Sequence, residues 1–266
     1  MRRAVIRFGA DRRSLLHAFL LLVALAGAWE LYVDVGGGNS LVLPAPHQIA
    51  VALYQDRSLL WSNFLVTAEE VLLGVLFAVV AALALATAMH FSRIVRSSVY
   101  PLLIASQTIP IPLMAPILVL WLGFGLEPKL IVVGLVSFFS IVVTTLAGFA
   151  SVDPELTKLM RTFGASRWRL FVSVELRWAL PGVFTGARLA VIFAVLGAVL
   201  AEEAGANSGL GYVFTQSVAQ LLTARAFATV VILSAFAILL FAGIGLIQRI
   251  ALPWSRQPIG SELEPR

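Results

Sequence analysis

Long apolar stretches, separated by short polar segments, dominate this chain. Six stretches are long enough to cross a bilayer, because a helix needs roughly 20 residues to span a hydrocarbon core of about 30 Å. They run approximately over Leu15–Val33, Phe64–Met89, Tyr100–Leu122, Leu130–Phe149, Val183–Ala201 and Phe227–Ile247. The pattern predicts an all-α integral membrane protein with six transmembrane helices and no separate soluble domain.

The third stretch contains more prolines than a regular helix accommodates. They are Pro101, Pro110, Pro112 and Pro116. A membrane helix tolerates proline where neighbours or water satisfy the freed carbonyl groups, so we expect a kinked or broken helix here. Polar side chains beside such a break either line a cavity or hydrogen-bond a neighbouring helix. We therefore assign Gln107, Thr108 and Pro110 to a candidate translocation pathway. Met114 is added to this set, with simple packing as the alternative.

The polar segment 151–182 differs from an ordinary connecting loop because it has helix-forming patterns of its own. Asp153 is suited to cap a helix, and Pro154 favours the first helical position. Four apolar residues then recur at the spacing of one helix face, namely Leu156, Leu159, Met160 and Phe163. Gly164 ends this helix, and Ser166 is suited to cap a second one. Two short helices joined at a glycine, with an apolar face and several arginines, indicate a docking surface for another protein.

The composition fits a membrane protein and excludes several classes of function. Apolar residues make up 60% of the chain and charged residues 12%, about half the charged fraction of a typical soluble domain. The mean hydropathy is +0.95. The absence of cysteine excludes disulfides, thiol catalysis and cysteine-ligated metals. The histidines, His17, His47 and His90, lie far apart in the sequence, so we expect no metal site.

The chain also lacks the residues for ATP hydrolysis or other catalysis. Neither Lys129 nor Lys158 follows a glycine, so the phosphate-binding pattern G-x-x-x-x-G-K is absent. Carboxylates are few and dispersed, and no serine has a histidine partner in a recognisable motif. We expect no enzymatic activity and no cofactor in this chain. If the function depends on ATP and Mg²⁺, another chain must bind them.

Basic residues are distributed unevenly between the segments that join the apolar stretches. With a cytoplasmic N-terminus, 15 of the 19 lie on the cytoplasmic side, and Arg188 lies just inside the fifth stretch. The external three are Arg57, Lys129 and Arg225. This positive-inside bias explains the basic charge without a nucleic-acid partner. It predicts a multi-pass inner-membrane protein with a cytoplasmic segment 1–13, a transmembrane unit 14–252 and a cytoplasmic tail 253–266.

The first apolar stretch has an alternative interpretation. Arg12 and Arg13 precede it, and Ala24-Leu25-Ala26 has the small residues of a signal-peptidase site. Because apolar residues continue to Val33, we favour a retained helix over a cleaved signal peptide.

Small side chains recur every four residues along the fifth stretch. They are Gly182, Gly186, Ala190, Ala194 and Ala198, with Glu202 at the next step. Close packing of helices explains such a series. If the series faces the bundle, Glu202 faces inward at the outer mouth, where carboxylates tend to mark pathways. We assign Glu202 and Glu203 to the candidate pathway, with a solvated charge or a contact to an external protein as the alternatives. Glu69 and Glu70 are expected to be solvated at the outer interface.

The polar segment around Gly164 resembles the EAA loop of the permeases of binding-protein-dependent ABC importers. That loop has the pattern E-A-A-x-x-x-G, followed after nine residues by I-x-L-P. Residues 174–176 match I-x-L, but Arg177 replaces the proline. The triplet has changed to Lys158, Leu159 and Met160. Segments 106–125 and 209–212 also resemble the family, so the resemblance covers nearly the whole chain after Leu43.

The resemblance implies a permease subunit whose segment 151–182, between helices 4 and 5, carries a cytoplasmic coupling helix that contacts an ATPase. The implied coupling residues are Glu155, Lys158, Leu159, Met160, Phe163, Gly164, Ala165 and Ser166. The implied partners are a second copy of the chain, two ATPase subunits, an external substrate-binding protein and membrane lipid. The subgroup transports sulfonates, taurine, nitrate or vitamin precursors. Residues 106–110 and Glu202-Glu203 favour a thiamine-pyrimidine-like heterocycle.

Two other classes of function remain as alternatives. A secondary transporter or channel that works alone should contain paired carboxylates or broken helices in two repeated halves, and no clear internal repeat is present. Such a protein would also have no use for a docking segment. A membrane enzyme or assembly factor is disfavoured by the lack of a catalytic motif.

Overall fold

The computed structural model describes residues 12–35 and 41–256, and every regular element within those ranges is helical. The helices are α1 (Arg12–Val35), α2 (Pro46–Gln55), α3 (Arg57–Phe91), α4 (Arg93–Ser106), α5 (Ile111–Leu122), α6 (Leu126–Ala150), α7 (Pro154–Thr162), α8 (Arg167–Leu170), α9 (Leu176–Glu203), α10 (Leu210–Ala219) and α11 (Thr223–Ala251), with a short 3₁₀ turn at Pro253–Arg256. The predicted all-α class is confirmed. Most of the predicted terminal segments, 1–13 and 253–266, lies outside the described residues.

Five of the six apolar stretches lie within single helices, and the third is divided between α4 and α5. Among the described residues, four helical runs are long and apolar enough to cross a membrane: α3, α6, the continuous run Arg167–Glu203, and α11. The pair α4 and α5 makes a fifth if it is one broken span, since the two helices bend by 100° at residues 107–110. The predicted break in the third stretch is thereby confirmed. A sixth span, formed by α1, stays a prediction.

Helices α6 and α9 form the centre of the bundle because small residues bring their backbones together. A Cβ atom added at Gly148 would lie 2.8 Å from the Ala179 Cα, and one at Gly186 would lie 2.8 Å from the Ile141 Cα. Further along α9, Ala190 and Ala194 are completely buried. The predicted series of small residues is therefore a packing surface, as close helix contact requires.

The polar segment 151–182 and the fifth apolar stretch are not separate elements, contrary to the expected boundary. Helix α8 continues through a π-helical turn, Phe171–Glu175, directly into α9. No glycine interrupts residues 167–181, and Pro181 is accommodated inside α9. The Thr185 hydroxyl donates to the Pro181 carbonyl at 2.9 Å. One helical run thus connects the exposed polar segment to the far end of the bundle.

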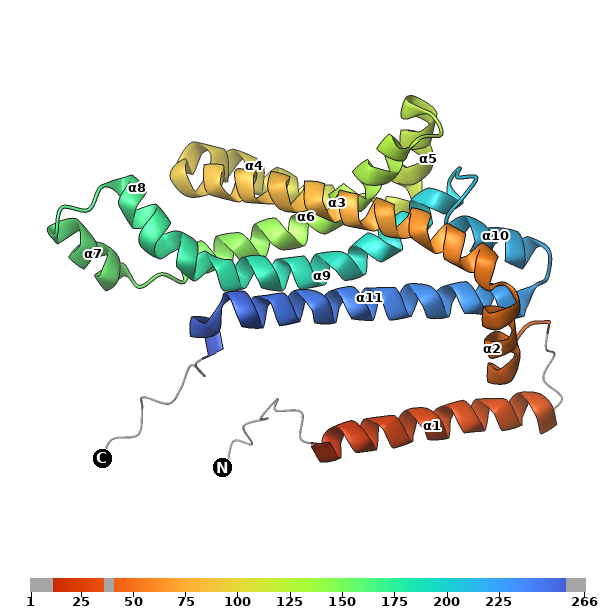
Figure 1. The fold of residues 1–266 in the computed structure, drawn as a ribbon. Coiled ribbons are helices and arrows are strands. Elements are labelled where there is room, and N and C mark those ends of the chain that lie inside the picture. Colours follow the sequence, from red (N-terminus) through yellow and green to blue (C-terminus); the bar gives the residue numbers. More distant parts are fainter. Residues whose placement is uncertain (1–11, 36–40, 257–266) are drawn as a thin grey trace.

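The bundle has two different ends (Figure 1). Helix α7 projects beyond one end, whereas α2, α5 and α10 lie at the other. Helix α1 lies at the edge, and its Trp29 ring contacts Phe227 with 6.1 Å between ring centroids. No residue from Ala237 to Ala251 in α11 is fully buried, and one side of this half is an exposed apolar face, with Ile238, Leu239, Leu246, Ile247 and Ile250 each more than half exposed.

Candidate functional site

A cluster of polar side chains lies where the beginnings of α3 and α6 meet the end of α9. We call it the Glu202 cluster, and its members are Asn63, Thr67, Glu70, Lys129, Glu202 and the backbone of residues 209–211. Asn63, Thr67 and Glu70 share one face of α3, because helical positions three and four residues apart are neighbours. Thr67, Glu70 and Glu202 are each no more than 1% exposed.

Both carboxylate oxygens of Glu202 accept hydrogen bonds within the chain. The Thr67 hydroxyl donates to Oε1 at 2.6 Å, and the Gly211 N–H donates to Oε2 at 2.5 Å. Thr67 in turn accepts a bond of 2.8 Å from the Leu210 N–H. The predicted inward orientation of Glu202 is confirmed, whereas the neighbouring Glu203 is exposed. These bonds attach the end of α9 to α3 and α10.

Two glycines allow the chain to approach Glu202 this closely. Gly209 has a φ of +111°, which favours glycine, and its N–H donates to Asn63 Oδ1 at 2.8 Å. A Cβ added at Gly209 would overlap the Glu202 carboxylate, and one at Gly211 would lie 2.8 Å from the Val199 carbonyl oxygen. The segment Gly209–Tyr212 is thus fixed by steric fit.

Glu70 forms a buried ion pair instead of the solvated charge expected from the sequence. Its Oε1 lies 2.5 Å from Lys129 Nζ, and its Oε2 has no hydrogen-bond partner among the described residues. Glu69, one position earlier, is exposed as expected. The expectation for Glu70 was wrong because Lys129, which was assigned to an external loop, lies in the first turn of α6 beside α3. Such a pair is costly to break, since either charge left alone is buried without compensation.

The second candidate region is α7 with the turn after it, and its predicted local structure is confirmed. The Asp153 carboxylate accepts a bond of 2.7 Å from the Glu155 N–H. Gly164 has a φ of +76°, and Ser166 accepts from the Arg169 N–H at 3.3 Å. The predicted coupling residues all lie on α7 and this turn. They are Glu155, Lys158, Leu159, Met160, Phe163, Gly164, Ala165 and Ser166.

The apolar face of α7 is only partly covered by the residues that the structure describes, with Leu156 and Met160 half-buried. No residue of α7 is buried. Leu159 is 52% exposed and Phe163 is 79% exposed, and Trp168 on α8 is 66% exposed. Large apolar side chains are therefore exposed at this end, and whether they form an interaction site stays a prediction.

The base of this region is anchored, unlike α7 itself. His90 at the end of α3 stacks on Phe149, with 4.5 Å between ring centroids. The His90 Nε2 and Glu175 Oε2 atoms lie 2.7 Å apart, and Phe171 packs beside Trp168 at 5.6 Å between centroids. These contacts join α8 and the π-helical turn after it to the ends of α3 and α6.

The break between α4 and α5 holds the remaining candidate pathway residues. Gln107 and Thr108 are exposed, and each satisfies its polar group locally: Gln107 Nε2 donates to Ser106 Oγ at 3.3 Å, and the Thr108 hydroxyl donates to the Ala105 carbonyl at 2.7 Å. Pro110 lies immediately before α5, and Met114 is half-buried. Within the described part of the chain, neither Gln107 nor Thr108 bonds to a neighbouring helix, which was the alternative.

Helix α5, which follows this break, lies at the same end of the bundle as the Glu202 cluster. Ala115 and Leu118 pack with Val132 of α6 and Ala201 of α9. Because Ala201 directly precedes Glu202, α5 packs next to the Glu202 cluster. Whether these residues line a pathway stays a prediction.

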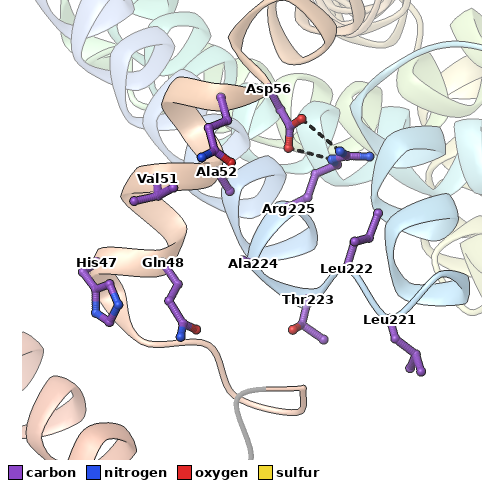
Figure 2. A pocket seen from close by; sticks show the side chains of 11 residues that line it. His47, Gln48, Val51, Ala52, Asp56, Leu221, Leu222, Thr223, Ala224 and Arg225 are labelled. Carbon is purple, nitrogen blue, oxygen red and sulfur yellow. Dashed lines mark hydrogen bonds and ion pairs between the residues drawn. The ribbon is translucent and has the colours of Figure 1, made fainter.

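A cavity of about 500 Å³ lies between α2 and the start of α11 at the same end. Figure 2 shows Asp56 and Arg225 paired at one side of it, with two bonds of 2.7 and 2.9 Å. Leu221 adopts a φ of +58° on the opposite side. From the sequence, Arg225 was only an external basic residue, because no spacing pattern links it to Asp56, which lies 169 positions earlier.

One group of side chains among the described residues has ligand atoms near enough to share a metal ion. Glu30, Asp34 and His47 have these atoms within 4.8 Å of one another. The His47 ring already contacts the Glu30 carboxylate through Nδ1. Asp34 and His47 are exposed, and exposed acidic groups commonly gather without a metal.

Comparisons with known proteins agree with the resemblance of the α7 region. Residues 74–257 match the family described as "Binding-protein-dependent transport system inner membrane component". The chain is 36% identical over 240 residues to the formylaminopyrimidine transport permease protein ThiX of Halalkalibacterium halodurans, covering 90% of this chain and 94% of the relative. It is 32% identical to the riboflavin transport system permease protein RibX of Chloroflexus aurantiacus, covering 95% and 94%.

A less similar permease and a solved transporter structure also match this chain. The taurine transport system permease protein TauC of Escherichia coli is 27% identical, with 95% of this chain and 94% of the relative covered. An inward-facing structure of the MetNI methionine ABC transporter matches the fold with a TM-score of 0.62 at 19% identity, covering 73% of this chain and 96% of that chain. The chain belongs to the family of binding-protein-dependent transport system inner membrane components, the permease subunits of ABC transporters.

Proposed function

We propose that this chain is the permease subunit of an ATP-driven importer that carries a small heterocycle of the formylaminopyrimidine type into the cell. The observation that carries the proposal is the 36% identity to a formylaminopyrimidine permease over 90% of the chain. A riboflavin permease at 32% identity also transports a nitrogen heterocycle. A taurine permease at 27% identity supports a sulfonate as the second candidate.

The exposed face of α7 supplies the contact with a separate ATPase in this proposal. The chain has no phosphate-binding loop of its own, so ATP and Mg²⁺ bind to the partner. ATP binding closes the ATPase pair, α7 and α8 follow, and the helical run Arg167–Glu203 carries the displacement to the far end. Coupling requires only that the ATPase bind two states of the permease with different affinity.

The remaining parts of the proposed assembly follow from the family. Two copies of the chain enclose the pathway, and an external binding protein delivers the substrate to the end that holds the Glu202 cluster. Helix α1 completes six spans, and both termini are cytoplasmic. Gln107, Thr108, Pro110, Met114, Glu202 and Glu203 lie at or near the external end of the pathway in this arrangement.

Uptake measurements test the proposal directly. The gene for this chain is deleted and then restored, and the cells are given labelled formylaminopyrimidine or labelled taurine. We expect restoration to recover uptake of the pyrimidine and not of taurine, and ATP depletion to abolish it. Recovery of taurine uptake alone would assign the sulfonate, and uptake that persists without ATP would indicate a transporter that works alone.

A further inference from the structure

Arg188 is a positive charge inside a membrane-spanning helix, and nothing in the proposed transport mechanism uses it. It lies on α9, at the boundary with α11. Its Nε atom is buried and has no hydrogen-bond partner among the described residues. No ion pair within the described chain includes Arg188 either. Charged side chains within membrane spans are costly and generally have a partner or a ligand.

The guanidinium group is held in a defined position against α11. Its Cζ atom lies 4.0 Å from the centroid of the Phe241 ring, which is a cation–π contact. A Cβ added at Gly245 would lie 3.4 Å from the same Cζ atom, so the absent side chain of Gly245 leaves room for the guanidinium. Arg188 is therefore oriented before any ligand arrives.

This guanidinium faces a cavity of about 280 Å³ between α9 and α11. The lining residues are Arg188, Phe241, Ala242, Gly245, Leu246 and Arg249. Two arginines and no carboxylate therefore line the cavity. Arg249 lies one helical turn, about 6 Å, beyond Gly245 toward the end of α11. Side chains tilt toward the N-terminus of their own helix, so Arg188 on the antiparallel α9 points toward the same end.

The surroundings of the cavity are apolar and uncovered. Leu246 is 59% exposed, Ile247 is 56% exposed and Ile250 is 71% exposed. A guanidinium fork matches the oxygen geometry of a phosphate group, and the exposed apolar side chains match acyl chains. A basic pocket between spans near the end of a helix is suited to an anionic headgroup.

We propose that the cavity between α9 and α11 binds the phosphate group of an anionic phospholipid, with Arg188 as its main ligand and the acyl chains along the exposed face of α11. The phosphate accepts a hydrogen bond from the buried Nε–H of Arg188, and the bound lipid occupies the space between α9 and α11. A soluble phosphate ion has the same headgroup chemistry but no chains to contact α11, so the two sources can be distinguished.

Native mass spectrometry of the full chain tests this assignment. The protein is transferred from nanodiscs containing equal amounts of phosphatidylglycerol and phosphatidylcholine, and the retained lipids are counted. We expect the wild-type chain to retain phosphatidylglycerol preferentially, and Arg188→Gln to lower that retention about tenfold or more, as loss of a charge-assisted bond implies. The matched control, Arg96→Gln, removes an exposed arginine on α4 and leaves retention unchanged.

A second variant separates loss of the site from loss of the fold. Gly245→Leu keeps both arginines and places a side chain in the cavity, so it should also lower retention. Inorganic phosphate in large excess should not displace the lipid. Displacement by inorganic phosphate without a preference between the two lipids would overturn the lipid assignment. Equal retention of phosphatidylglycerol by wild-type, Arg188→Gln and Gly245→Leu chains would overturn the site itself.

Discussion

The two ends of the helical run Arg167–Glu203 are built in opposite ways. At the Glu202 end, a buried carboxylate accepts bonds from a hydroxyl and a backbone N–H, and an ion pair lies beside it. Next to the other end, α7 has no buried residue, and Phe163 is 79% exposed. Buried polar contacts within the chain hold the first end, whereas large apolar side chains are left exposed beside the second.

Substitutions at one end of this helical run should therefore affect mainly stability, and substitutions at the other end mainly function. Changes at the Glu202 end should lower the free energy of unfolding, because they leave buried polar groups without partners. Changes at the α7 end should leave stability nearly unchanged, because exposed side chains contribute little to it. The following predictions test this division in order of decreasing effect on stability.

Lys129→Met should have the largest effect, because it leaves the Glu70 carboxylate buried at 1% exposure without its cation. Breaking such a pair from one side costs about 3–5 kcal/mol. Thermal unfolding of the purified chain in detergent measures the loss. The double variant Lys129→Met with Glu70→Met should recover much of it, and a double variant as unstable as the single one would contradict the ion-pair account.

Gly209→Ala should be the next most damaging change. The added Cβ would overlap the Glu202 carboxylate, and the φ of +111° is unfavourable for alanine. We expect a loss of about 2–4 kcal/mol from backbone strain and overpacking. Gly243→Ala is the matched control, because no atom lies within 4 Å of its added Cβ. Equal unfolding temperatures for the two variants would show that the Gly209 turn is not sterically fixed.

Glu202→Gln should have an intermediate effect. The amide keeps one oxygen for Thr67 but places an NH₂ group toward the Gly211 N–H, so one donor loses its acceptor. The expected cost is about 1–3 kcal/mol, measured by the same unfolding experiment. Glu203→Gln, on the exposed neighbour, should change stability by less than about 0.5 kcal/mol. A larger effect at Glu203 than at Glu202 would contradict the assignment of the cluster.

Gly164→Pro should separate the two ends most clearly. Proline requires a φ near −65°, whereas the turn has a φ of +76°, so α7 is displaced relative to α8. Because the turn contacts no buried core, the protein should remain in the membrane with nearly unchanged unfolding temperature. ATP-dependent substrate uptake should be lost. Normal uptake in this variant would count against a coupling role for α7.

The sequence predicted the local features of the α7 region because they depend on neighbouring residues. Asp153, Gly164 and Ser166 each act within three positions, and the structure confirms all three. The broken third stretch was predicted for the same reason, since proline acts on the adjacent backbone. The series of small residues on α9 required only a four-residue period.

The Glu202 cluster was predicted only in part because it depends on contacts between distant segments. The inward direction of Glu202 followed from helical spacing. Its partner Thr67 lies 135 positions away, and the pair of Glu70 and Lys129 is separated by 59 positions. The only nearby indication was the glycine-rich segment 209–212, which was recognised by resemblance and not by its steric role.

The most direct test of the central claim compares two exposed phenylalanines at opposite ends of the molecule. Phe163 and Phe124 are each 79% exposed. The tagged chain is purified from native membranes under mild conditions, and copurified proteins are identified by mass spectrometry. Wild-type and Phe124→Ala chains should both recover an ATPase with a phosphate-binding loop, and Phe163→Ala should lose it while remaining folded. Equal recovery of the ATPase with Phe163→Ala, or no ATPase with any of the three chains, would contradict the claim that α7 is the docking surface.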